Sequence, residues 1–231
     1  MSNMKDKLKI LDIITIILVA AAIGMVFFYA PIERVMGYVQ KVFYFHVASA
    51  WVGMISFIVA AVAGGIYLRT SNKKWDVISY ASVEIGIVFA IIAIAMGSIW
   101  ARPIWNTWWT WDPRLTTTSI MTLIYIAYLM LRQGIDDPDR RARFGAVYVI
   151  VGVLSVPLTF LSIRIFRTIH PVVIGKASAA SAAFDMAPKM LQTFLFSLLV
   201  FSILFIDLLW HRVKLGKLEE EVEHLKITTM E

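Results

Sequence analysis

Two histidines and a cluster of tryptophans are the residues of this sequence best suited to bind a ligand. His46 lies in KVFYFHVASAW and His170 in FRTIHPVVI. Five of the eight tryptophans lie between Trp100 and Trp111, in GSIWARPIWNTWWTWDPRLT. Neutral imidazole is a common axial ligand of haem iron, and two imidazoles fill both axial positions. The indoles could form a platform for a flat conjugated ligand, or they could rest in lipid as an aromatic belt.

The tryptophan segment also carries structural signals. At 100° per residue, Trp105, Trp108 and Trp109 share a face, which predicts a short helix lying along the membrane surface. Asp112 before Pro113 is typical of a helix N-cap followed by proline at the first helical position. Arg114 could then face a pocket and pair with an anionic ligand group or with a lipid phosphate.

The two propionates of a haem would need cations, and the sequence offers several near these segments. The candidates are Arg34, Lys41, Arg102, Arg114, Arg164 and Arg167. A zinc site is less favoured, since it requires three or four protein ligands. Besides the two histidines, the same loops provide only Glu33, Asp112 and Asp185 as carboxylates.

The composition restricts the class of protein. Hydrophobic residues make up 59% and charged residues 16%, which indicates a membrane protein and not a soluble domain. The chain has no cysteine, which excludes disulfides, thiolate metal sites and covalent haem attachment to the chain itself. The net charge of +6 does not indicate nucleic-acid binding, because the basic residues lie between apolar runs. No nucleophile and base are arranged for catalysis, so we predict no enzyme and no catalytic residue.

Six apolar runs are long enough to span a bilayer, which takes about 20 residues. The predicted spans are 10–30, 43–68, 78–100, 116–131, 144–163 and 188–210. They lack the alternation of barrel strands, so we predict a single all-α membrane domain over 1–231, with the first span retained. Residues 211–231 are predicted to form a short cytoplasmic amphipathic helix. His211 and His224, near this end, are interpreted as solvated.

The distribution of Lys and Arg predicts the orientation. The termini and the loops after spans two and four hold fourteen, and the other three loops hold eight. Positive charge favours the cytoplasmic side, so both termini are expected inside. His46, His170 and the tryptophan-rich loop would then all lie at the outer face.

The run GSIWARPIWNTWWTWDPRLTTTSIMTLIY closely resembles the tryptophan-rich WWD segment of haem-handling proteins of cytochrome c maturation. The order of FHVASAW, this segment and TIH resembles the CcmC branch, the haem exporter protein C family. The resemblance covers most of the chain and is strongest between His46 and Tyr125. The larger CcsA-type synthetases share the segment but have more spans and further histidines.

The resemblance implies that non-covalent haem b binds at the outer face of the inner membrane. His46 and His170 would be the axial ligands of its iron. The haem platform would be Trp105, Trp108, Trp109 and Trp111, with Asp112 and Arg114 completing the motif. The haem would pass to a CcmE-like chaperone, beside the ATP-binding cassette subunits CcmA and CcmB and a CcmD-like small protein.

The sequence departs from the family pattern in two places. Ala48 stands where proline is usual after the first histidine, and Ile165 and Phe166 stand where tryptophans are usual before the second. Arg164 replaces an acidic residue. Two alternatives to haem transfer remain at this stage: a membrane redox subunit that binds surface haem or quinone, and a structural subunit whose histidines are replaceable.

Overall fold

The structure is a computed structural model, and it describes residues 2–171 and 186–230. Within this part six helices are long and apolar enough to cross a membrane, and no strand is found. The helices are α1 (Ser2–Gly24), which continues into the π-helical η1 (Met25–Tyr29), then α2 (Gln40–Thr70), α3 (Lys73–Trp105), α4 (Pro113–Gln133), α5 (Pro138–Gly152), α6 (Ser155–Ile165) and α7 (Pro188–Met230). The prediction of an all-α protein with six spans is confirmed, and the chain is a multi-pass membrane protein.

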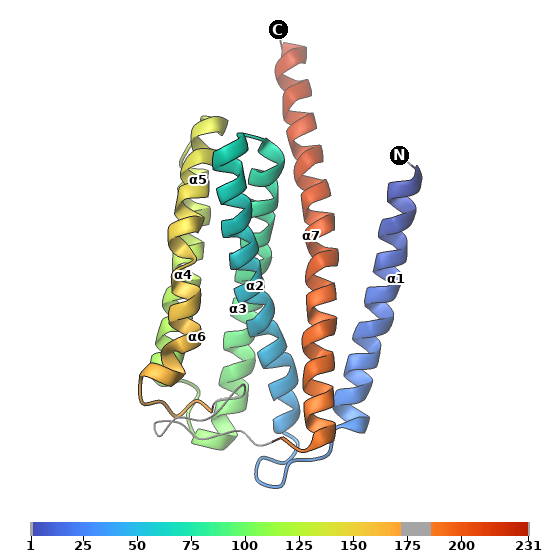
Figure 1. The fold of residues 1–231 in the computed structure, drawn as a ribbon, viewed down its shortest axis with the longest axis vertical. Helices are drawn as coiled ribbons and strands as arrows, with labels where there is room; N and C mark the ends of the chain where they lie inside the picture. Colours follow the sequence, from blue (N-terminus) through green and yellow to red (C-terminus); the bar gives the residue numbers. More distant parts are fainter. Residues whose placement is uncertain (1, 172–185, 231) are drawn as a thin grey trace.

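The helices form an upright bundle with α2 and α3 at its centre (Figure 1). On one side lie α4, α5 and α6, and on the other lie α7 and then α1, whose main neighbour in the bundle is α7. Both termini lie at one end of the bundle (Figure 1). The connections 31–39, 106–112 and 166–171 lie at the opposite end. We name this opposite end the loop end; it brings together the three segments that the sequence predicted to share a face.

Local signals explain several of the helix boundaries. Asp112 is the N-cap of α4, since its Oδ1 accepts from Arg114 N at 2.9 Å, and Pro113 is the first helical residue. Asp137 and Pro138 start α5 in the same way. α3 ends at Asn106, which has a left-handed conformation with φ of 54°. The predicted capping role of Asp112 is therefore confirmed.

The predicted interfacial helix over Trp105, Trp108 and Trp109 is wrong. α3 continues past Trp100 to include Trp105, and 107–112 is irregular. The left-handed Asn106 stops the helix, and the Thr107 hydroxyl then accepts from Trp109 N and donates to Trp109 O. These local hydrogen bonds replace those of a helix.

Two further boundaries differ from the prediction. The fifth span is broken into α5 and α6 at 153–154, because Pro157 has no N–H with which to continue the helical hydrogen bonds to Val153. The segment predicted as an amphipathic tail helix continues the last span, since α7 runs without a break from Pro188 to Met230. Gly216 lies within that helix, where a Cβ would meet Val77 Cγ1 at 2.8 Å, so this glycine allows α7 to approach α3 closely.

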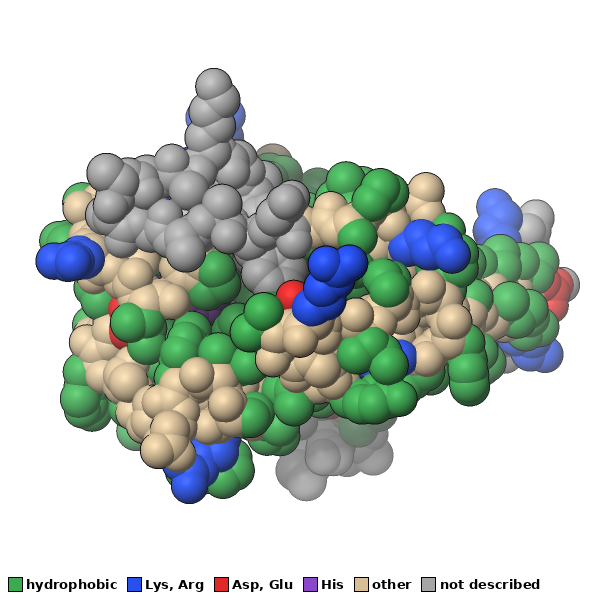
Figure 2. All heavy atoms as spheres, turned by 90° about the horizontal axis from the view of Figure 1, so that it is seen from below, with side chains coloured by type: hydrophobic (Ala, Val, Ile, Leu, Met, Phe, Trp, Pro, Cys, Tyr) green, Lys and Arg blue, Asp and Glu red, His purple; other side chains and the backbone are tan. Residues whose placement is uncertain are grey.

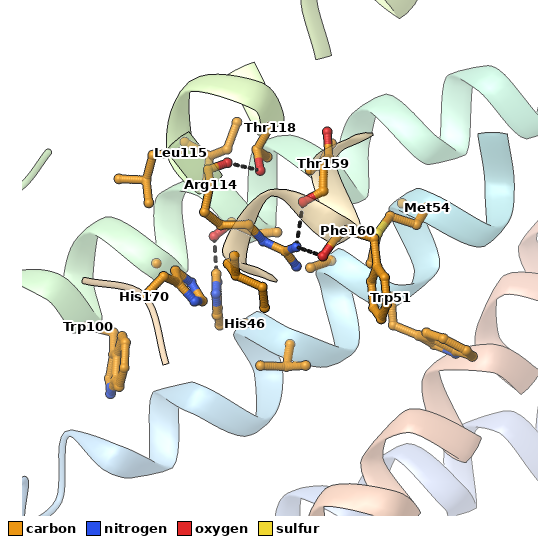
Figure 3. A pocket seen from close by; sticks show the side chains of 18 of the residues that line it. His46, Trp51, Met54, Trp100, Arg114, Leu115, Thr118, Thr159, Phe160 and His170 are labelled. Carbon is orange, nitrogen blue, oxygen red and sulfur yellow. Dashed lines mark hydrogen bonds between the residues drawn. The ribbon is translucent and has the colours of Figure 1, made fainter. Parts of the chain in front are cut away.

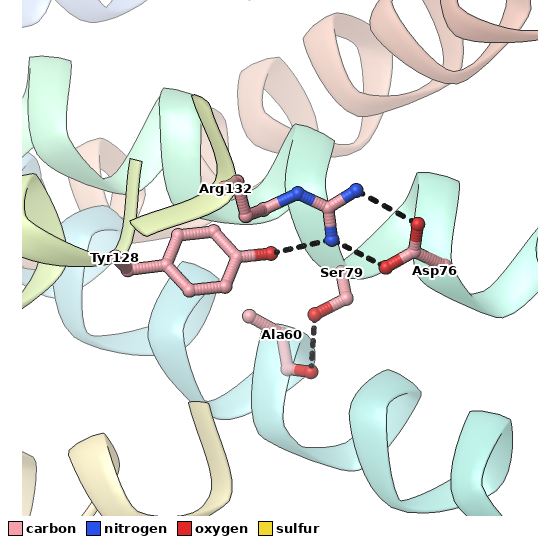
Figure 4. A network of polar contacts seen from close by, with 5 residues as sticks. All are labelled: Ala60, Asp76, Ser79, Tyr128 and Arg132. Atoms are coloured by element: carbon pink, nitrogen blue, oxygen red, sulfur yellow. Dashed lines mark hydrogen bonds and ion pairs between the residues drawn. The ribbon is translucent and has the colours of Figure 1, made fainter. Parts of the chain in front are cut away.

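A buried ion pair joins α3 and α4 near the end with the termini (Figure 4). The Arg132 guanidinium donates to both carboxylate oxygens of Asp76 at 2.5 and 2.8 Å, and to the Tyr128 hydroxyl at 3.3 Å. Beside it the Ser79 hydroxyl donates to the Ala60 carbonyl at 3.0 Å. Both charged side chains are almost entirely buried, so the pair fixes the position of α4 against α3.

Candidate functional site

A cavity opens at the loop end, between α2, α3, α4 and α6. Its wall is largely apolar, and its ionisable lining residues are His46, Arg114, Arg164 and His170. Seen from the loop end, the surface is hollowed, and a histidine side chain is visible in the hollow among hydrophobic side chains (Figure 2). The cavity therefore unites both candidate histidines, which lie far apart in the sequence.

His46, on α2, is held in one orientation by α3. Its Nδ1 lies 2.8 Å from the Ala93 carbonyl oxygen (Figure 3). Because a carbonyl oxygen only accepts, Nδ1 carries the hydrogen, and Nε2 keeps its lone pair for a ligand. Gly97 lies one turn further along α3, where a Cβ would meet His46 Cε1 at 2.9 Å. The imidazole therefore occupies the space that a side chain at position 97 would fill.

His170 lies in the segment after α6, and Asp112 holds that segment in place. Asp112 Oδ2 accepts from the Thr168 hydroxyl at 2.6 Å and from Ile169 N at 3.0 Å. Thr168 Oγ1 in turn accepts from His170 N at 3.0 Å. Burial, with Arg114 and His46 adding positive charge, lowers the pKa of His170 to about 3. The imidazole is therefore neutral near pH 7, as a metal ligand must be.

The two imidazoles lie side by side, with ring centres 6.3 Å apart and planes 41° apart (Figure 3). A metal bound between two imidazole nitrogens at about 2 Å each would put the ring centres roughly 6 Å apart. The spacing between His46 and His170 thus suits two axial ligands of one iron.

Arg114 extends from α4 across the cavity to the middle of α6. Its guanidinium donates to the carbonyl oxygens of Thr159 at 2.7 Å and Phe160 at 3.2 Å (Figure 3). Among the described residues no carboxylate lies within ion-pair distance of Arg114. A cation without a carboxylate partner in an apolar cavity favours an anionic ligand group.

The structure divides the predicted tryptophan platform. Trp105 and Trp109 line the cavity, and the Trp105 ring lies 6.3 Å from the His170 ring. Trp108 and Trp111 are 58% and 80% exposed and do not line it. Trp100, which the sequence did not assign to the platform, is buried in the lining. The segment therefore has an inner group of indoles and an outer pair.

The other candidate cations are distributed unevenly around the cavity. Arg164 lines it, whereas Lys41 donates to the Phe27 carbonyl and Arg102 to Asn106. Arg34 and Arg167 are exposed and do not line the cavity. Arg114 and Arg164 are therefore the cations best placed to meet a ligand.

The departures from the family pattern also have places in the structure. Ala48 is fully buried in α2. Ile165 and Phe166 are exposed at the end of α6, at 62% and 47%. These two residues belong to the surface beside the cavity and do not line it.

Several residues that position the two histidines could not be identified from the sequence. Ala93 and Gly97 orient His46, and Thr168 connects Asp112 to His170. Ala93 and Gly97 are small residues one helical turn apart, which indicates a close contact on this face of α3. This spacing does not indicate that the contact is with His46. His211, predicted to be solvated, is half exposed, and its Nε2 lies 2.7 Å from Asp12 Oδ1.

The fold and the site define the class: a multi-pass helical membrane protein with a paired-histidine cavity at one end of the bundle. The family model described as "Heme exporter protein C" (CcmC) matches residues 1–228, and the chain belongs to this family. A heme exporter protein C of Bradyrhizobium diazoefficiens is 31% identical over 87% of this chain and 74% of its own length. The heme exporter protein C of Rhodobacter capsulatus is 31% identical over 81% of this chain and 77% of its own length. That of Escherichia coli is 33% identical over 62% of this chain and 59% of its own length.

Proposed function

We propose that this protein binds non-covalent haem b in the cavity as cargo, with His46 and His170 as axial ligands. Membership of the heme exporter protein C family supports a role in haem handling for cytochrome c maturation. The observation that carries the assignment is the pair of imidazoles, 6.3 Å apart on an apolar cavity. Ala93 holds the tautomer of His46 that leaves Nε2 free.

The other lining residues suit the rest of the haem. Trp105 and Trp109 offer aromatic surface to the porphyrin, and Arg114 and Arg164 offer charge to the propionates. Asp112 would act indirectly, because it accepts hydrogen bonds from the segment that carries His170. Because the chain has no cysteine that could form a thioether with haem, coordination and non-covalent contacts would hold the haem. Its release would then break no carbon–sulfur bond.

The proposed place of action is the outer face of the inner membrane. The excess of Lys and Arg at the terminal end supports an inside location for both termini, which puts the loop end outside. There the protein would present haem to a CcmE-like chaperone. Its other proposed partners are the CcmA and CcmB subunits and a CcmD-like protein, and no chemical step is assigned to this chain.

The outer tryptophans are suited to meet the chaperone. Trp108 and Trp111 are exposed beside the cavity, and Arg102 lies over the Trp108 ring at 5.9 Å. Exposed indoles beside a cation are typical of binding surfaces. We assign these two residues to the acceptor and the inner group to haem.

The first experiment is the visible absorption spectrum of the haem-loaded protein in detergent. Wild type should give a low-spin bis-histidine spectrum, and His46→Ala and His170→Ala should each lose it. His211→Ala is the matched control, because this histidine does not line the cavity. Unchanged spectra in both cavity variants would refute the axial assignment.

A second experiment separates binding from transfer. Trp111→Ala should keep the wild-type spectrum yet slow haem transfer to a purified CcmE-type acceptor at least several-fold. Trp105→Ala should instead alter the spectrum, since this ring lies next to His170. Equal loss of haem in both variants would contradict the division between inner and outer tryptophans.

A further inference from the structure

A second group of metal-ligating side chains lies between α1 and α7, near the end with the termini. It consists of Asp12 on α1 and of Asp207 and His211, one turn apart on α7. One potential ligand atom from each residue lies within 4.8 Å of the other two. The group is separate from the haem cavity, which is at the opposite end of the bundle (Figure 1).

The distances suit a shared ion. His211 Nε2 lies 2.7 Å from Asp12 Oδ1 and 3.6 Å from Asp207 Oδ1. Ligands about 2.0–2.2 Å from a tetrahedral ion lie roughly 3–4 Å from one another. Small rotations of the half-exposed Asp12 and His211 side chains would therefore bring all three atoms around one centre.

One buried carboxylate oxygen in this group lacks a hydrogen-bond partner. Asp207 is only 7% exposed, and its Oδ1 accepts no hydrogen bond. Thr15, one turn after Asp12 on α1, is 4% exposed, and its hydroxyl faces Asp207. A buried carboxylate oxygen without a donor is unfavourable, and an ion between the two helices would remove this penalty.

We propose that Asp12, Asp207 and His211 form a binding site for one divalent transition-metal ion of the zinc type. Two carboxylates would neutralise the dication, which suits a site between two membrane-spanning helices. The imidazole nitrogen favours zinc over magnesium or calcium, which prefer oxygen ligands. The Thr15 hydroxyl or a water would complete four-fold coordination.

The site has a structural consequence. In its 18-residue apolar core α1 is the least buried of the six spans, at 17%, and it packs mainly on α7. A metal bridge would therefore attach α1 to the bundle. Without the ion, the polar contacts of α1 and η1 with α7 include the hydrogen bonds of His211 with Asp12 and of Tyr29 with Gln192.

The test is Zn²⁺ binding to the full-length protein without a histidine tag, purified in detergent and measured by equilibrium dialysis at pH 7. We expect wild type to bind zinc with a component that Asp12→Asn, Asp207→Asn and His211→Gln each weaken at least tenfold. Glu221→Gln, an exposed glutamate on the same helix, is the matched control and should bind as wild type. Excess Mg²⁺ should not compete.

The variants also separate this site from the haem cavity. Zinc held by His46 and His170 would survive Asp207→Asn, so unchanged binding in that variant would overturn the proposal, as would no binding by wild type. Equal competition by Mg²⁺ would exclude His211 as a ligand. If Asp207→Asn fails to fold, the half-exposed Asp12→Asn gives the same test. This experiment measures zinc binding and no haem spectrum. A negative result would therefore not contradict the proposed function.

Discussion

The two cavity histidines differ in how the protein keeps them ready for a ligand. His46 is oriented within the helical bundle, by the Ala93 carbonyl on one side and the absence of a side chain at Gly97 on the other. His170 lies in an irregular segment that is held by hydrogen bonds to Asp112 and Thr168 and by ring contacts with Trp105 and His46. Substitutions that crowd His46 and substitutions that release the His170 segment should therefore differ in their effects on the haem spectrum and on stability.

Gly97→Ala tests the crowding of His46. The new Cβ would lie 2.9 Å from the imidazole, so the ring must turn away from the Ala93 carbonyl. We expect the haem-loaded variant to lose most of the bis-histidine spectrum while keeping its helical circular dichroism. Gly65→Ala is the control, because a Cβ there has open space. A wild-type spectrum for Gly97→Ala would show that this close approach is unimportant.

The pKa of His170 predicts how haem-free protein responds to acid. His170 has a pKa of about 3 when folded and about 6.5 when unfolded, so the unfolded chain binds the extra proton between these values. Stability should therefore be present above pH 6.5 and decrease as the pH falls toward 3. The thermal midpoint of wild type should drop more between pH 7 and pH 5 than that of His170→Gln. Equal drops would contradict the assignment to His170.

At the scale of helices, Asp112 joins two segments with its two carboxylate oxygens. Oδ1 caps α4 by accepting from Arg114 N, and Oδ2 accepts from Thr168 and Ile169. Asparagine is as good an N-cap as aspartate, but its amide nitrogen cannot accept a hydrogen bond. Asp112→Asn should therefore keep the cap and lose the hold on the His170 segment.

The expected result is a haem spectrum close to that of His170→Ala, with little change in thermal stability. Asp112→Ala should add about 1 kcal/mol of destabilisation from loss of the cap. Asp137→Ala, which removes only the cap of α5, should cost a similar amount and leave the spectrum unchanged. A wild-type spectrum for Asp112→Asn would show that the His170 segment needs no such support.

At the scale of the whole molecule, the polar network near the termini connects helices without taking part in ligand binding. Arg132 pairs with Asp76, and Arg212 pairs with Glu84 at 2.6 Å. The Tyr80 ring lies between the two guanidinium groups, 4.9 and 5.4 Å from them. This arrangement links α3 with both α4 and α7.

Asp76→Asn tests that structural role. It would leave the buried Arg132 without its counter-charge, which costs roughly 3–5 kcal/mol in buried ion pairs. We expect a much lower thermal midpoint but a wild-type haem spectrum in protein that remains folded at low temperature. Lys73, whose pair with Asp139 is exposed, provides the control, and Lys73→Gln should change stability by less than about 1 kcal/mol. A lost spectrum in folded Asp76→Asn would connect this network to the cavity.

Features that depend on neighbours along the chain could be predicted from the residues alone. The apolar runs specify six spans, because the bilayer requires a minimum length of apolar helix. Asp112 and Pro113 specify the start of α4, because an N-cap acts within one turn. The types of residue also sufficed to single out His46 and His170 as candidate ligands.

The residues that contact one another could be identified only from the packing of the helices. His46 and His170 share a cavity because α2 and the end of α6 pack at the same end of the bundle, and Gly97 matters only because α3 passes behind His46. The tryptophans separate into inner and outer groups because Asn106 ends α3, which helical periodicity could not indicate. These features depend on contacts between segments far apart in the chain, and a local pattern carries no information about its distant partner.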